Sequence, residues 1–211
     1  PAIFDTVEEF WNTTRHLGTI LSLVEKMADG VPDEFRNYVP RLVPQILASI
    51  DTSQIQISEW RSGNRQYAST AAQFDRLELI LRSIRGLRGT LGDYLHLLVP
   101  ALVKLLDVLT DPATTAGSST HREFSRLTIT TVQTISVLLM TSDNTLPPPT
   151  SSVVAAGAGG GRSTNTMVAL VSSSSSLPAR AAQPLMRMLS REPIIGKDIG
   201  LALIEAICVC A

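Results

Sequence analysis

The chain has 211 residues, which is room for one ordinary domain and a second small one. Hydrophobic residues make up 44% and charged residues 18%, which excludes a wholly disordered chain, and the low aromatic share of 5% favours an aliphatic core of packed helices. The 18 basic and 19 acidic residues give a net charge of −1, so the overall charge does not favour binding to nucleic acid or to an anionic membrane.

The first quarter of the chain predicts two helices. Apolar residues recur at helical spacing, and we expect the first helix over 3–28. The Gly-Val-Pro-Asp segment 30–33 breaks this pattern. A second helix is expected over 34–50, and Pro44 is expected to kink it or to mark a late start. The first stripe consists of Ile20, Leu23, Val24 and Met27.

The middle of the chain alternates between polar and apolar segments. The polar stretch 51–68 is expected to be an inserted loop, because it contains Ser-Gly-Asn and few apolar residues. Apolar periodicity then predicts helices over 69–90 and 93–109, and the Asp-Pro pair at 111–112 ends the second of these.

Segment 93–107 repeats segment 37–51 at a uniform offset of 56 residues. Each copy follows an amphipathic helix, so the unit is a repeated helical hairpin. Such hairpins are typical of HEAT and armadillo arrays, although their usual period of about 40–47 residues is shorter. We therefore predict an all-α, HEAT/armadillo-like α-solenoid of antiparallel helix pairs. The identical pairs are Tyr38 with Tyr94, Leu42 with Leu98, Val43 with Val99, Pro44 with Pro100 and Asp51 with Asp107.

The repeated segments also predict a core between the helices. The expected core residues are Leu42, Val43, Ile46 and Ile50 in the first copy and Leu98, Val99, Leu102 and Leu106 in the second.

The last third predicts helices over 122–140, 178–190 and 195–210. Between the first two lies 141–176, rich in Ser, Gly and Pro, which is expected to be a long disordered insertion. The expected units are a repeat over 1–50, a polar insertion over 51–68, a repeat over 69–110, a repeat over 121–190 interrupted by 141–176, and the start of a further repeat over 194–211.

No catalytic, cofactor-binding or metal-binding residue is predicted. His16, His96 and His121 lack partners at metal-ligand spacing, and His96 is expected to be packed or half-buried in an apolar helix. The Gly-rich segment 157–164 lacks the Gly-Lys-[Ser/Thr] of a phosphate loop. The kinase motifs His-Arg-Asp and Asp-Phe-Gly do not occur.

Two further groups allow more than one interpretation. Arg82, Arg85 and Arg88 lie three residues apart on one side of the expected helix. They form either a solvated face or a basic strip that binds phosphates or an acidic partner. Cys208 and Cys210 are expected to be reduced and partly buried, with a redox or metal pair as the alternative. Reduced cysteines indicate a cytoplasmic protein.

No segment has the features of a signal peptide or a membrane span. The most apolar stretch, 95–109, is too short and contains Pro100, Lys104 and Asp107. The chain starts at Pro1 and stops inside an apolar periodic run, so we expect a fragment of a longer protein.

Two ordered motifs resemble the HEAT array of the target-of-rapamycin (TOR) kinase family. The first is Asp-Glu-Phe-Arg-Asn-Tyr-Val-Pro-Arg-Leu-Val-Pro-Gln-Ile-Leu at 33–47. The second, more specific, is Leu-Gly-Asp-Tyr-Leu-His-Leu-Leu-Val-Pro-Ala-Leu-Val-Lys-Leu-Leu-Asp at 91–107. The clear resemblance covers roughly 3–110, and the segments 52–68 and 141–176 depart from the family pattern.

The resemblance implies a scaffolding segment of a large serine/threonine protein kinase that acts in nutrient and growth signalling. ATP and magnesium would be used by a distant catalytic domain, and this segment alone would be inactive. The implied partners are TOR complex subunits such as a Raptor-type adaptor, and a second copy through self-association. The alternative is a fragment of a HEAT or armadillo adaptor or transport receptor unrelated to TOR.

Overall fold

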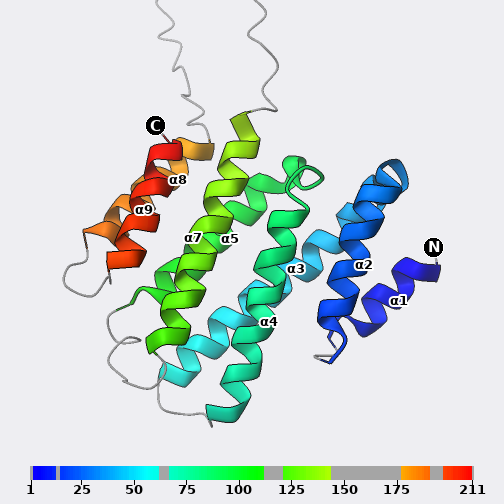
Figure 1. Cartoon of the computed structure of the whole chain (residues 1–211), viewed down its shortest axis with the longest axis horizontal. Coiled ribbons are helices and arrows are strands. Elements are labelled where there is room, and N and C mark those ends of the chain that lie inside the picture. The colour runs from blue at the N-terminus through cyan, green and yellow to red at the C-terminus, as the bar shows by residue number, and fades with distance from the viewer. Residues whose placement is uncertain are drawn as a thin grey trace, which may run out of the picture.

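A computed structural model describes residues 2–12, 15–61, 67–111, 121–143, 177–190 and 197–210, and these are helical, with no strand among them (Figure 1). The elements are α1 (Ala2–Phe10), α2 (Leu17–Gly30), α3 (Pro32–Arg61), α4 (Tyr67–Gly86), the 3₁₀ turn η1 (Gly92–Tyr94), α5 (Leu95–Leu109), α7 (His121–Asp143), α8 (Leu177–Leu189) and α9 (Lys197–Cys210).

The helices pack in two layers. Helices α2, α4, α7 and α9 contact one another in chain order and form one layer, while α3, α5 and α8 form the second layer behind it (Figure 1). Helix α1 lies at the end of the stack, beside α2. The predicted all-helical class is confirmed, and the stacking in chain order is consistent with an α-solenoid-like class.

The core lies between the two layers. All eight predicted core residues of α3 and α5 are buried, none more than 2% exposed. The two copies of the repeated segment lie in α3 and α5, which contact each other in the second layer. Their paired positions also share an environment: Leu42 and Leu98 are both buried, and Asp51 and Asp107 are both exposed.

The single helix expected over 3–28 is wrong, because α1 ends at Phe10 and α2 begins at Leu17. The sequence Asn-Thr-Thr at 12–14 consists of poor helix formers, whose side chains compete with the backbone for hydrogen bonds. Trp11 is only 1% exposed and anchors the end of α1 in the core.

The loop expected over 51–68 is also wrong for the part that is described. Helix α3 continues to Arg61, and α4 already begins at Tyr67. The helix buries Ser53 and Ile57, two and six residues beyond the end of the repeated segment at Asp51, so a narrow buried face continues there. The expected late start at Pro44 is wrong as well, because the helix runs from Pro32 through that proline.

The remaining helices lie close to their expected ranges. Helix α7 ends at Asp143, so the first three residues of the segment 141–176 belong to a helix. The rest of that segment, 144–176, lies outside the described residues, and its disorder stays a prediction. The division into repeat units likewise stays a prediction.

Candidate functional site

The described part of the chain contains no group of three or more His, Cys, Asp or Glu side chains that could hold a metal ion. Within the same residues, no helix is both long and apolar enough to cross a membrane.

The structure corrects two expectations about isolated residues. His96 is exposed rather than packed, because the buried face of α5 is occupied by Leu95, Leu98 and Val99. Cys208 is exposed rather than partly buried, whereas Cys210 is half-buried as expected, and neither forms a disulfide. The side chain of His121 lies outside the described residues, whereas His16 is exposed.

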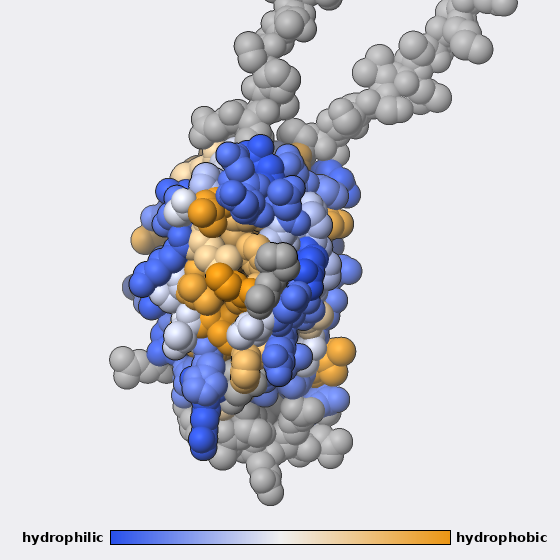
Figure 2. Space-filling view, turned by 90° about the vertical axis from the view of Figure 1, so that its right-hand side faces the viewer, coloured by the Kyte–Doolittle hydropathy of each residue, from blue (hydrophilic) through white to orange (hydrophobic). Residues whose placement is uncertain are grey.

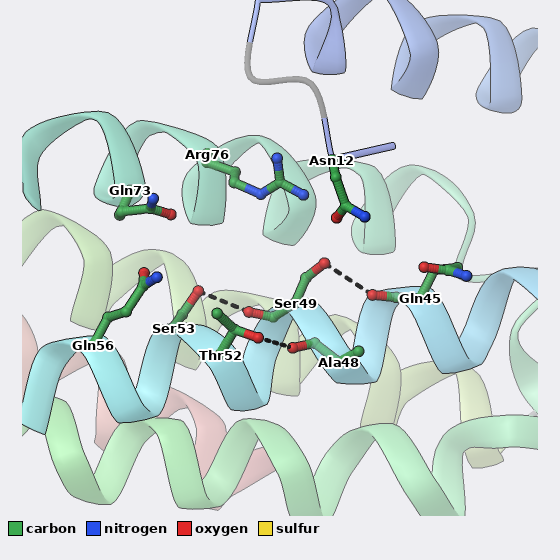
Figure 3. A pocket seen from close by; sticks show the side chains of 9 residues that line it. All are labelled: Asn12, Gln45, Ala48, Ser49, Thr52, Ser53, Gln56, Gln73 and Arg76. Atoms are coloured by element: carbon green, nitrogen blue, oxygen red, sulfur yellow. Dashed lines mark hydrogen bonds between the residues drawn. The ribbon is translucent and has the colours of Figure 1, made fainter. Parts of the chain in front are cut away.

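A polar pocket of about 280 Å³ lies between α3, α4 and the end of α1 (Figure 3). Helix α3 lines it with a row of polar side chains that point toward α4, and the opposite side carries Gln73 and Arg76 of α4 together with Asn12. The α3 residues are Gln45, Ala48, Ser49, Thr52, Ser53 and Gln56.

Arg76 is the charged residue among the lining side chains. Its Nη2 donates a hydrogen bond of 3.0 Å to the backbone carbonyl of Trp11, and the side chain is partly buried. Burial lowers the pKa of the Arg76 guanidinium from its usual value, but an arginine remains protonated in proteins. The pocket therefore holds a positive charge that is partly shielded from water.

The three hydroxyl groups of the pocket use their protons within α3. Ser49, Thr52 and Ser53 donate to the backbone carbonyls four residues earlier, at 2.8, 2.7 and 2.8 Å (Figure 3). Oγ of Ser49 also accepts a hydrogen bond of 3.0 Å from Nε1 of Trp11. Since each hydroxyl has a single proton, these groups offer oxygen lone pairs to the pocket.

Two other arginines connect neighbouring helices through carboxylates. Arg41 of α3 contacts Asp5 and Glu8 of α1 at 3.0 and 2.7 Å. Arg126 of α7 contacts Asp75 and Glu78 of α4 at 3.3 and 2.6 Å. These carboxylates neutralise both arginines, which connect neighbouring helices. Because the pairs are largely exposed, their contribution to stability is small.

The arginine strip of α4 is not one uniform face. Arg88 lies beyond the end of α4 at Gly86, and both it and Arg82 of α4 are exposed, as the solvated-face interpretation expects. Arg85 instead is partly buried and donates a hydrogen bond of 3.2 Å to Gln133 of α7. Burial, together with the charge of Arg82, lowers the pKa of Arg85.

Both ends of the stack expose apolar side chains. At the α1–α2 end, Ile3 and Leu23 are exposed, and Figure 2 shows a hydrophobic area on this face that is bordered by hydrophilic residues. At the other end, Leu201, Ile204 and Cys208 of α9 form an exposed stripe at spacings of three and four residues.

Sequence reasoning missed the polar pocket. Its signal is a polar stripe on α3, formed by Gln45, Ser49, Thr52 and Gln56 at helical spacing. The stripe was hidden because part of it falls in the stretch expected to be a loop. Arg76, on the other side of the pocket, belongs to the next helix, α4.

Comparison with known proteins relates half of this chain to a kinase. The serine/threonine-protein kinase mTor of Drosophila melanogaster is 33% identical to it over 106 residues, which is 50% of this chain and 4% of that protein. The chain thus spans a small fraction of this relative's length. No family model and no solved structure matches the chain.

Proposed function

We propose that the chain is a HEAT-type scaffold segment of a TOR-type serine/threonine protein kinase. The observation that carries this proposal is the similarity of half the chain to a segment of the fly kinase. The proposed role is to hold protein partners within the kinase complex, in the cytoplasm.

The layered packing supports a repeat of the HEAT type. In such arrays each unit contacts its neighbours, and equivalent helices of successive units lie side by side. The two copies of the repeated motif lie in α3 and α5, which contact each other. The matched pairs Leu42 and Leu98, and Val43 and Val99, are buried in both copies. Internal prolines also recur in this layer, in α3, α5 and α8.

The surface supports a role in holding other proteins. Exposed apolar residues at the two ends, such as Leu23 and Leu201, are of the kind that neighbouring helices bury in an array. The proposed partners are TOR complex subunits such as a Raptor-type adaptor, and a second copy of the kinase. ATP and magnesium would serve a catalytic domain elsewhere in the parent protein, and not this segment.

The full reading frame of the transcript that encodes this chain tests the proposal. We expect further helical repeats and a kinase catalytic domain in the same frame. A complete frame without a kinase domain would contradict the proposal and favour an unrelated HEAT or armadillo adaptor, such as a transport receptor.

A further inference from the structure

We propose that the polar pocket between α3 and α4 binds an acidic peptide segment of a partner protein, with Arg76 holding the carboxylate. The proposed site stands independently of the TOR assignment, because it depends only on the charge and hydrogen-bonding groups that line the pocket.

The charge of Arg76 is not balanced by a carboxylate within the described part of the chain. Arg41 and Arg126 each contact two carboxylates, whereas the described hydrogen bond of Arg76 goes to a backbone carbonyl. No Asp or Glu is among the lining residues. Glu59 of α3 lies about one helical turn beyond Gln56, the last residue of α3 in the lining. A guanidinium has five N–H donors, so Arg76 retains donors for a carboxylate in the geometry that such pairs favour.

The rest of the pocket offers acceptors. The hydroxyl oxygens of Thr52 and Ser53 present lone pairs, since both protons are used within α3. Oε1 of Gln56 is buried and accepts no hydrogen bond from the residues that the structure describes. Such an acceptor costs free energy until a donor reaches it. A phosphate group would bring only further oxygen atoms to this row, whereas a peptide brings backbone N–H donors.

The shape of the pocket favours an extended chain. Its lining follows α3 from Gln45 to Gln56, which is about 16 Å at roughly 1.5 Å per residue of helix. A peptide of about five extended residues has this length, at roughly 3.3 Å per residue. Its acidic side chain would lie against Arg76 of α4, and its N–H groups would face the acceptors of α3.

Fluorescence anisotropy with the full 211-residue chain and a capped, dye-labelled peptide Ser-Gly-Glu-Gly-Ser tests this site. The matched peptide carries Gln in place of Glu. We expect the Glu peptide to bind about tenfold more tightly, as is usual for a charge-assisted hydrogen-bonded pair. Equal binding of the two peptides, or binding of neither, would overturn the proposal.

Three variants locate the binding. Arg76→Gln should abolish the preference for Glu. Gln73→Glu should abolish it too, because the new carboxylate lies three residues before Arg76 on the same helix and leaves the contact with Trp11 in place. Arg82→Gln is the matched control, since it removes the same charge from an exposed position of α4, and should keep the preference.

Circular dichroism of each variant establishes that it is folded, and Gln73→Glu tests the site even if Arg76→Gln does not fold. A preference for Glu that survives in Gln73→Glu would contradict the assignment of Arg76. Free glutamate provides a last control. If it displaces the labelled peptide as well as the unlabelled peptide does, the pocket is a small-molecule site and the peptide assignment is wrong.

Discussion

Nε1 of Trp11 donates a hydrogen bond of 3.0 Å to Oγ of Ser49, which lies 38 residues later in the chain. The carbonyl of Trp11 accepts a second hydrogen bond, from Arg76 of α4. Trp11, which directly follows α1, therefore connects the middle of α3 with α4 at the edge of the polar pocket.

Truncation of Trp11 should be costly for this reason. Trp11→Ala removes a side chain that is 1% exposed, so we expect the free energy of unfolding to fall by about 3–5 kcal/mol. Phe10→Ala is the matched control, since Phe10 is 41% exposed, and should cost less than about 1 kcal/mol. Urea denaturation followed by circular dichroism measures both, and equal losses would contradict this packing.

The repeated core can be tested in α5 with two leucines. Leu102 is fully buried, whereas Leu97 is 43% exposed on the same helix. Leu102→Ala should lower the free energy of unfolding by about 2–5 kcal/mol, and Leu97→Ala by less than about 1 kcal/mol. A loss well below about 1 kcal/mol for Leu102→Ala would show that α5 does not pack as described.

Tyr38 should make the stability depend on pH in alkaline solution. Burial, and then the carboxylate of Glu8, raises the pKa of Tyr38 from 10.0 to about 12. The unfolded chain therefore loses the phenolic proton first, so this contribution to stability is intact below pH 10 and is lost as the pH rises through about 12.

Tyr38→Phe provides the measurement. The Tyr38 hydroxyl has no hydrogen-bond partner within the described residues, so the variant should change the stability at neutral pH by less than about 1 kcal/mol. Urea denaturation at increasing pH should show a shallower decline for the variant than for the wild type. Parallel declines would contradict the raised pKa of Tyr38.

The purified chain should not transfer phosphate to a protein substrate in the presence of ATP and magnesium. Its sequence lacks the phosphate-binding, metal-binding and catalytic-loop motifs that phosphoryl transfer requires. A radiolabelled-ATP assay measures this, with an active protein kinase as positive control. Activity that follows the chain through successive purification steps would contradict the scaffold assignment.

The sequence was most informative where the apolar pattern is strong. The stripes around Leu42 and Leu98 predicted both helices and their buried faces, because helical spacing determines which side chains share a face. It was least informative where the pattern is weak. After Asp51, the buried face of α3 consists of few residues, such as Ser53 and Ile57. Because the rest of this segment is polar, its composition indicated a loop.

The polar pocket could not be predicted because it is a tertiary feature. Gln45, Ser49 and Gln56 share one face of α3, but nothing in their spacing shows that Arg76 lies across from them. The position of Arg76 opposite these residues follows only from the packing of α3 against α4. Likewise, the free lone pairs of the hydroxyls depend on bonds made within the folded helix.

The TOR assignment is tested most directly by the mass of the natural polypeptide and the peptides it contains. An antibody against residues 67–109, which span α4 and α5, would isolate it from the source cells for mass spectrometry. We expect a polypeptide many times longer than 211 residues, with peptides of a kinase catalytic domain in the same chain and a Raptor-type adaptor co-purifying. A complete polypeptide without kinase peptides would contradict the assignment.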